Sequence, residues 1–476
     1  MENKIKKNYF YNLLYKLVMI VTPLIISPYI SRVLGAEKIG EYSFAYSIAH
    51  VFLVIALLGI GDYGCRTIAK CKNDIEKRNT VFSEIFYFQL IMSVFLCVSY
   101  IVYCFFICNE KNMAFTQIPL VLSALFDISW LIFGLEKFYI STIRSVIVKI
   151  ITIILILLFV KQYNDLWIYG VIMSASVFVT QLSIWPILYK YVHFRKVSFS
   201  GILRHIKPNL ILFLPVVANN LLGYFDKIMI GTLSTKAELG CYDSAEKLLS
   251  FPNSVITALG GVMLPRVSNA LAYGEEEKIN DYLYKTLIFM IFASSALSFG
   301  IASISNEFIP VFFGEGFDLV ISLIFCLFPT IIFICWANVM KTQILLPREK
   351  DKLLVVSIIS GAILNLILNL ILIPNYGSIG AAFATMISEG LIAILGTIFC
   401  RKYFNIKRNL FNTIPFVLFG AIMMVSIIFI HFDNDILTII VKVGVGAGIY
   451  LTLSLLYIML FHKQIFNSFK KRSKKV

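Results

Sequence analysis

Residues 353–373 read LLVVSIISGAILNLILNLILI, and no charged side chain stands between Lys352 and Glu389. An α-helix of about 20 apolar residues spans the hydrocarbon core of a bilayer, so this stretch predicts a membrane-spanning helix. The whole chain shares this character, since 59% of its 476 residues are apolar and 14% are charged. Soluble proteins have about 25% charged residues. The sequence therefore predicts an all-α, polytopic membrane protein and excludes a soluble enzyme, a disordered chain or a disulfide-rich secreted domain.

Fourteen apolar windows of this kind follow one another along the chain, and each predicts a transmembrane helix. They fall near residues 9–33, 41–64, 81–107, 114–135, 145–161, 166–189, 208–232, 240–264, 285–305, 318–340, 353–373, 377–400, 411–431 and 437–461. The first window is too long for a signal peptide and has no small-residue cleavage site, so we interpret it as an uncleaved helix. An even number of spans places both termini on one side of the membrane.

The positions of Lys and Arg predict which side that is. With a cytoplasmic N-terminus, 33 of the 42 Lys and Arg residues lie in inside segments and 5 in outside loops. Cytoplasmic loops carry an excess of these residues, so both termini are predicted to be cytoplasmic. The net charge of +15 then reflects topology and a basic tail at 463–476 that suits anionic lipid. A nucleic-acid partner is not expected.

A weak internal repeat at an offset of 200 residues suggests the domain organisation. Seven residues recur at this spacing: Ile30, Gly40, Tyr42, Ala45, Gly61, Arg66 and Glu76 match Ile230, Gly240, Tyr242, Ala245, Gly261, Arg266 and Glu276. We predict two six-helix lobes, 1–204 and 205–405, then two additional helices within 406–462 and the basic tail. Because six is even, the lobes share one orientation, as in transporters with parallel repeats and a substrate site near the midplane.

Carboxylates inside the predicted spans are candidates for ion coupling, because a charge in the bilayer needs a partner, water or a function. Glu389 lies near the middle of its span, where it binds a proton or cation or else fixes helix packing through a hydrogen bond. Asp226 and Asp127 are further candidates. Asp62 is another, although it stands four residues before Arg66 and could pair with it.

Cations in the spans are candidates for binding an anionic substrate. Lys16 lies two turns inside the first span, where it either meets the substrate or extends to the lipid headgroups. Lys227 directly follows Asp226, so the two side chains project about 100° apart and are not expected to pair. Asp243 and Lys247 stand four residues apart and could form their own ion pair.

The repeat mates Arg66 and Arg266 lie at predicted cytoplasmic helix ends. They either anchor the topology there or flank an entrance and bind phosphate through the bidentate geometry of the guanidinium group.

Motifs for covalent chemistry are missing from the sequence. It contains no GxxxxGK[ST], GxSxG or HExxH pattern, and its nine cysteines form no CxxC pair. Asp433, Asn434 and Asp435 resemble a sugar-nucleotide metal motif but fall in a short predicted external loop. No catalytic residue, metal site or cofactor is therefore expected.

Several stretches of the chain carry a resemblance to a known family. NYFYNLLYKL (8–17), SPYISRVLGAEKIGEYSFAYSI (27–48) and LLGIGDYGCRTIAK (57–70) resemble the start of the Wzx-type oligosaccharide flippases of bacterial polysaccharide synthesis. In the second half, the matching stretches are YFDKIMIGTLSTKAELGCYDSAEKL (224–248), GGVMLPRVS (260–268) and NYGSIGAAFATMISEG (375–390). The resemblance covers about residues 8–400 and extends to a superfamily with multidrug extruders and peptidoglycan-precursor flippases.

The resemblance implies a V-shaped fold of two six-helix bundles around a cationic cavity. It also implies translocation of a polyprenyl-diphosphate-linked oligosaccharide repeat unit to the outer leaflet, coupled to an ion gradient, for O-antigen, capsule or exopolysaccharide synthesis. The family has no invariant site motif, so we assign the site by charge. We assign substrate binding to the cations Lys16, Arg32, Arg66, Lys227 and Arg266. We assign ion coupling to the carboxylates Asp62, Asp127, Asp226 and Glu389.

Two other functions stay open. A multidrug exporter of the same superfamily would favour a more acidic cavity. A polysaccharide polymerase or ligase would need a large external loop, whereas the predicted external loops do not exceed roughly fifteen residues. The expected partners are membrane lipids and the polymerase and initiating glycosyltransferase of the pathway, and the protein is expected to be a monomer.

Overall fold

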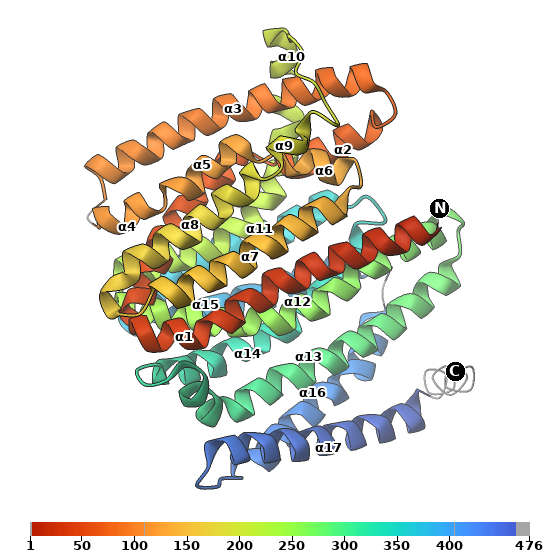
Figure 1. Ribbon diagram of the computed structural model, residues 1–476. Coiled ribbons are helices and arrows are strands. Elements are labelled where there is room, and N and C mark those ends of the chain that lie inside the picture. Colours follow the sequence, from red (N-terminus) through yellow and green to blue (C-terminus); the bar gives the residue numbers. More distant parts are fainter. Residues whose placement is uncertain (1, 109, 404, 463–476) are drawn as a thin grey trace. The chain divides into compact units, whose positions relative to one another are not determined.

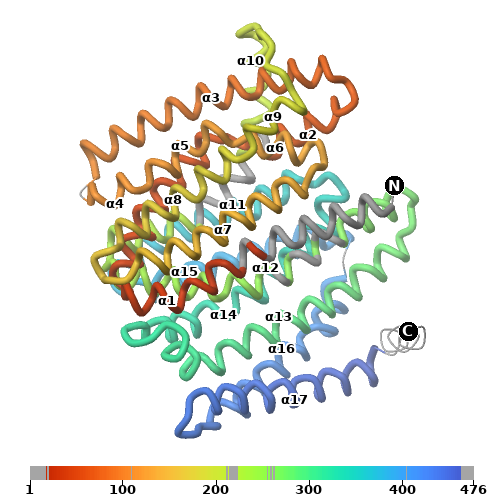
Figure 2. Tube along the Cα trace, in the orientation of Figure 1, coloured from red at the N-terminus to blue at the C-terminus, as the bar shows by residue number. Residues whose placement is uncertain are grey.

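The computed structural model of the chain describes residues 2–108, 110–403 and 405–462 (Figure 1). Its side-chain description omits residues 2–17, 19–20, 211–212, 214–222, 255, 258–259 and 261–262. Figure 2 follows the chain from end to end.

The described residues are almost entirely helical and form no strand. Nine of their helical segments are long and apolar enough to cross a membrane. The prediction of an all-α, multi-pass membrane protein is confirmed, and the count of fourteen spans stays a prediction.

Contacts divide the chain into two compact units, Met1–Asp243 and Ser244–Val476. The first unit takes in the whole of α11 (Ile206–Leu233) and the start of α12 (Lys236–Ala272), because α11 packs against α1 (Glu2–Leu57). This division follows contacts within the chain and differs from the predicted lobes 1–204 and 205–405, which stay a prediction.

The remaining elements of the first unit are helices of very different lengths. They are α2 (Ile60–Lys70), α3 (Ile75–Phe106), α4 (Lys111–Thr116), α5 (Ile118–Phe126), α6 (Ser129–Gly134), α7 (Phe138–Phe159), the 3-10 turn η1 (Tyr163–Asp165), α8 (Leu166–Leu182), α9 (Trp185–Leu188) and α10 (Phe199–Leu203). Within this unit α1 packs against α3, α7 and α11, and α5 packs against α8 (Figure 1).

Glycine explains why two predicted windows can share one long helix. In α1 the windows 9–33 and 41–64 meet at Gly35, whose φ of 70° and ψ of 172° are not helical. In α15 (Asp351–Cys400) the windows 353–373 and 377–400 meet at Gly377, with φ of 56° and ψ of −137°. Only glycine adopts such angles without steric cost, so each long helix contains a bend between two predicted spans.

The second unit is built around α13 (Glu276–Phe313). Its other elements are α14 (Asp318–Val339), the π-helical segment η2 (Met340–Leu345), α15, α16 (Ile406–Ile428) and α17 (Asp435–Phe461). Helix α13 packs against α14, α16 and α17, and α14 packs against α15. The two additional C-terminal helices are thereby anchored on α13, where Met423, Ile427 and Tyr450 form a buried cluster.

Candidate functional site

A buried ion pair joins α11 to the start of α12. The Lys227 ammonium lies 2.7 Å from Asp243 Oδ1, and the two side chains are 12% and 5% exposed. The helices are joined by a short connection at residues 234–235, so residues at equal distances from it face each other. Lys227 and Asp243 meet for this reason. The sequence spacing had suggested Lys247 as a partner of Asp243 and had not suggested Lys227.

The same helix pairing holds the neighbouring carboxylate. Tyr242 donates its hydroxyl to Asp226 Oδ2 over 3.3 Å, and both residues are buried. Asp226 and Lys227 thus each meet the α12 residue sixteen positions further along the chain. Two candidate residues of the sequence hypothesis, Asp226 and Lys227, therefore lie in one polar layer between α11 and α12.

Aromatic side chains of α1 adjoin this layer. The His50 ring stacks on Tyr224 with 4.2 Å between centroids, and Tyr46 lies 6.2 Å from the same tyrosine ring. All three side chains are half-buried. The Nδ1 atom of His50 is buried and has no hydrogen-bond partner among the described residues. We call Tyr46, His50, Tyr224, Lys227 and Asp243 the central cluster.

A second buried carboxylate, Glu84 on α3, was not among the predicted candidates. Its Oε2 atom accepts a hydrogen bond from the Arg204 guanidinium and lies 3.0 Å from His205 Nε2. His205 Nδ1 is in turn 2.6 Å from the Tyr63 hydroxyl on α2. Burial lowers the pKa of His205, which outweighs the opposing effect of Glu84. The signal that could have found Glu84 is a lone carboxylate within the apolar window 81–107.

A third buried group, an ion pair in the second unit, was also not among the predicted candidates. On α17, the Lys442 ammonium lies 2.7 Å from Glu307 Oε1 on α13, and both side chains are buried. Lys442 also donates to the Ser303 carbonyl over 3.4 Å. This pair ties an additional C-terminal helix to the core of the second unit, which is a structural role.

The other predicted cations are more exposed. Arg66 on α2 and Arg266 on α12 have exposed side chains and belong to different units. Arg32 is exposed as well and donates from Nη1 to the Pro28 carbonyl over 2.7 Å. The side chain of Lys16 and the basic tail 463–476 lie outside the described residues.

The other predicted carboxylates occupy three different environments. Asp127 accepts a hydrogen bond from the Ser129 backbone over 2.9 Å, which stabilises the turn between α5 and α6. Asp62 is exposed in the first turn of α2, where a negative charge interacts favourably with the helix dipole. Glu389 is half-buried in α15. Within the described ranges, no group of His, Cys, Asp and Glu side chains is placed to hold a metal ion.

Comparison with known proteins identifies the family. The model of a family described as "Polysaccharide biosynthesis protein" matches residues 5–271, more than half of the chain. The chain belongs to this family. The resemblance to polysaccharide flippases found in the sequence is thereby confirmed.

Individual relatives are distant but match over most of their length. The chain is 23% identical over 378 residues to a "Putative O-antigen transporter" of Shigella dysenteriae, covering 78% of this chain and 94% of the relative. It is 22% identical over 386 residues to the protein of the same description in Escherichia coli (strain K12), covering 80% and 92%.

Among solved structures, the inward closed conformation of the lipid II flippase MurJ matches with a TM-score of 0.77. The match covers 95% of this chain and 98% of that structure at 16% identity. At this level of identity the likeness establishes a shared fold.

Proposed function

We propose that this protein translocates a polyprenyl-diphosphate-linked oligosaccharide from the inner to the outer leaflet of the bacterial cytoplasmic membrane, with both of its termini in the cytoplasm. The observation that carries the proposal is the family membership together with a MurJ-like fold over 95% of the chain. Transport of this kind needs no covalent chemistry and no cofactor. The repeat unit serves a surface polysaccharide such as O-antigen, capsule or exopolysaccharide.

The central cluster is the proposed binding region for the headgroup. A diphosphate needs a cation, and Lys227 is a cation that is largely shielded from water and lies 2.7 Å from Asp243 Oδ1. The diphosphate would take the place of Asp243 beside the ammonium. The aromatic faces of Tyr46, His50 and Tyr224 would then contact the apolar faces of the sugar rings.

Replacement of Asp243 by the diphosphate beside Lys227 also provides a mechanism for ion coupling. A buried carboxylate that loses its cation is unstable unless it gains a proton or another cation. Asp243 released from Lys227 would therefore take up such an ion. Among the predicted carboxylates, buried Asp226 and half-buried Glu389 suit the same role, whereas Asp127 serves a turn and Asp62 is exposed.

The exposed cations have a different proposed role. Arg32, Arg66 and Arg266 would attract the anionic headgroup toward the protein, because long-range attraction does not require burial. Lys16 joins this group as a sequence-based proposal. The polymerase and the initiating glycosyltransferase of the pathway are proposed partners, and the transporting species is proposed to be the monomer.

Depletion of the protein in its native host tests the function. Spheroplasts treated with a membrane-impermeant glycan oxidant report which lipid-linked oligosaccharide is exposed on the outer leaflet. We expect a protected repeat unit to accumulate on the inner leaflet. An exposed but unpolymerised unit would indicate a polymerase, and unchanged oligosaccharide with altered drug sensitivity would indicate a multidrug exporter.

A matched set of variants separates binding by Lys227 from a structural role of the ion pair. Lys227→Met leaves Asp243 buried without its cation, so loss of transport in this variant alone is ambiguous. The double variant Lys227→Met/Asp243→Leu removes both charges and restores a folded, inserted protein if the pair is structural. We expect this double variant to insert normally and still fail to transport. Normal transport by the double variant would contradict the binding role.

A further inference from the structure

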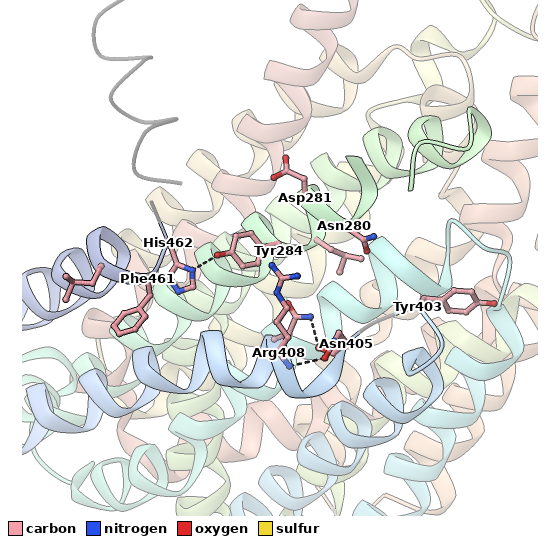
Figure 3. Close-up of a pocket in the computed structure, with 11 residues that line it drawn as sticks. Asn280, Asp281, Tyr284, Tyr403, Asn405, Arg408, Phe461 and His462 are labelled. Atoms are coloured by element: carbon pink, nitrogen blue, oxygen red, sulfur yellow. Dashed lines mark hydrogen bonds between the residues drawn. The ribbon is translucent and has the colours of Figure 1, made fainter. Parts of the chain in front are cut away.

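A polar pocket of about 700 Å³ opens at one end of the second unit (Figure 3). Its wall combines the start of α13, the start of α16 and the end of α17. The side chains that matter for the argument are Asn280, Asp281, Tyr284, Arg408, Leu460 and His462. Because the ends of membrane-crossing helices meet here, the pocket lies where the lipid headgroups meet water.

The pocket contains a cation, Arg408, that pairs with no carboxylate in the part of the chain that the structure describes. The Arg408 guanidinium lies over the Tyr284 ring, 5.9 Å from its centroid. The acidic side chain in the wall, Asp281, is already paired with Lys285 over 2.6 Å. The pocket therefore carries an uncompensated positive charge and favours an anion.

The wall is built around a buried histidine. His462 is 3% exposed, its Nδ1 atom is hydrogen-bonded to the Tyr284 hydroxyl, and its Nε2 atom has no partner among the described residues (Figure 3). A buried imidazole nitrogen without a partner costs free energy, which a ligand or a water molecule would recover. The α16 backbone adds to the positive character, since its first turn, capped by Asn405, lies in the same wall.

Apolar side chains at the rim of the pocket favour a lipid over a soluble anion as its ligand. Leu460 and Phe461, at the end of α17, are 67% and 66% exposed and also line the pocket. In a membrane these side chains would contact hydrocarbon tails while the pocket holds the polar group. Basic pockets between transmembrane helices are a recognised way of binding anionic lipid headgroups.

We propose that this pocket binds the phosphate group of a membrane lipid, with the Arg408 guanidinium as its main ligand. The Asn280 amide lies in the same wall and supplies further hydrogen-bond donors. Two lipids offer this chemistry: an anionic phospholipid of the bilayer, or the polyprenyl phosphate carrier of the proposed substrate. The site lies on α13, α16 and α17 and does not involve the central cluster, and only the second of these lipids rests on the proposed function.

Native mass spectrometry of the purified full-length protein tests the proposal. The added probes are phosphatidylglycerol, a polyprenyl phosphate, inorganic phosphate and diacylglycerol, which lacks a phosphate. We expect Arg408→Gln to lower retention of the phosphate lipids about tenfold, which corresponds to about 1.4 kcal/mol, because the variant loses a charge-assisted hydrogen bond to the phosphate. The probe that is retained more strongly identifies the lipid source.

The control variant is Lys407→Gln, which removes the same charge from the neighbouring exposed residue outside the pocket wall. We expect it to change retention less than about twofold. If Arg408→Gln fails to fold, Asn280→Asp provides a second variant, because a carboxylate at this exposed position repels the phosphate without altering the helix. Equal losses in the Arg408 and Lys407 variants would overturn the proposal. So would retention of diacylglycerol, or complete displacement of the lipid by inorganic phosphate.

Discussion

Gly40 and Gly240 bring the backbones of α1 and α12 into direct contact. A Cβ atom on Gly40 would lie 1.7 Å from the Lys236 carbonyl oxygen, and one on Gly240 would lie 1.9 Å from the Ala36 carbonyl oxygen. The contact is reciprocal, because residues 36 and 40 of one helix face residues 236 and 240 of the other. These are positions related by the 200-residue repeat in the sequence. Small residues allow such close helix crossings in membranes.

The first prediction concerns this crossing. Gly40→Ala would force the two helices apart, and overpacking of this kind costs about 1–3 kcal/mol of the free energy of unfolding. The matched control is Gly61→Ala on α2, where a Cβ would meet nothing within 4 Å. Since alanine favours a helix over glycine by about 1 kcal/mol, Gly61→Ala should raise the stability. Apparent melting temperatures in detergent measure both, and equal shifts would show that the crossing is not tight.

The second prediction concerns pH and His205. Burial lowers the pKa of His205 in the folded protein, so the unfolded state binds a proton first as the pH falls below about 6.5. The free energy of unfolding should therefore decrease from pH 7 toward acid. His205→Gln should flatten this dependence, whereas His193→Gln, at an exposed position, should leave its slope unchanged. Melting temperatures between pH 5 and 8 provide the test, and identical profiles for both variants would refute it.

The third prediction concerns Glu307 and Lys442. Removing one partner of a buried ion pair leaves an unpaired charge and typically costs about 3–5 kcal/mol, while replacing both with apolar residues is close to neutral. Lys442→Met should therefore be strongly destabilising, and Lys442→Met/Glu307→Leu should recover most of the loss. The exposed pair of Lys278 and Glu275 provides the comparison, since Lys278→Met should leave the melting temperature almost unchanged.

The fourth prediction concerns Trp130, which is buried at the start of α6. Its indole Nε1 donates to Gln89 Oε1 over 3.0 Å, and Gln89 Nε2 donates to the Ala124 and Asp127 carbonyls. Trp130→Phe would leave Gln89 Oε1 without this donor, at a cost of about 1–3 kcal/mol. Trp167→Phe, at a residue 58% exposed, should have little effect. Comparable melting temperatures for the two variants would show that the Trp130 hydrogen bond contributes little.

The predicted windows correspond closely to the helices. The window 318–340 matches α14 at Asp318–Val339, and the window 437–461 matches α17 at Asp435–Phe461. The window 114–135 was interpreted as one helix but forms α4, α5 and α6, because Pro119 and the turn at Asp127 interrupt the helix. Such interruptions depend on local packing as much as on residue type.

The candidate site was predictable only in part. Asp226 and Lys227 stand out as charges in an apolar window, and they do lie in a buried polar layer. Their partners Tyr242 and Asp243 could not be chosen from the sequence, because helical spacing identifies neighbours three or four residues away and not sixteen. The Glu84 network joins residues about 120 positions apart, so it depends on how α3, α2 and α11 pack.

The sequence by itself determined that the protein is helical, that it resides in a membrane and to which family it belongs. The physical reason is that backbone groups in lipid must form hydrogen bonds within their own segment, so an apolar run is enough to specify a helix. Tertiary structure alone decided which charges neutralise one another: Lys227 with Asp243, Lys442 with Glu307, and Arg408 with none of the described carboxylates. Ion pairing falls off with distance, and only the packing of the helices sets those distances.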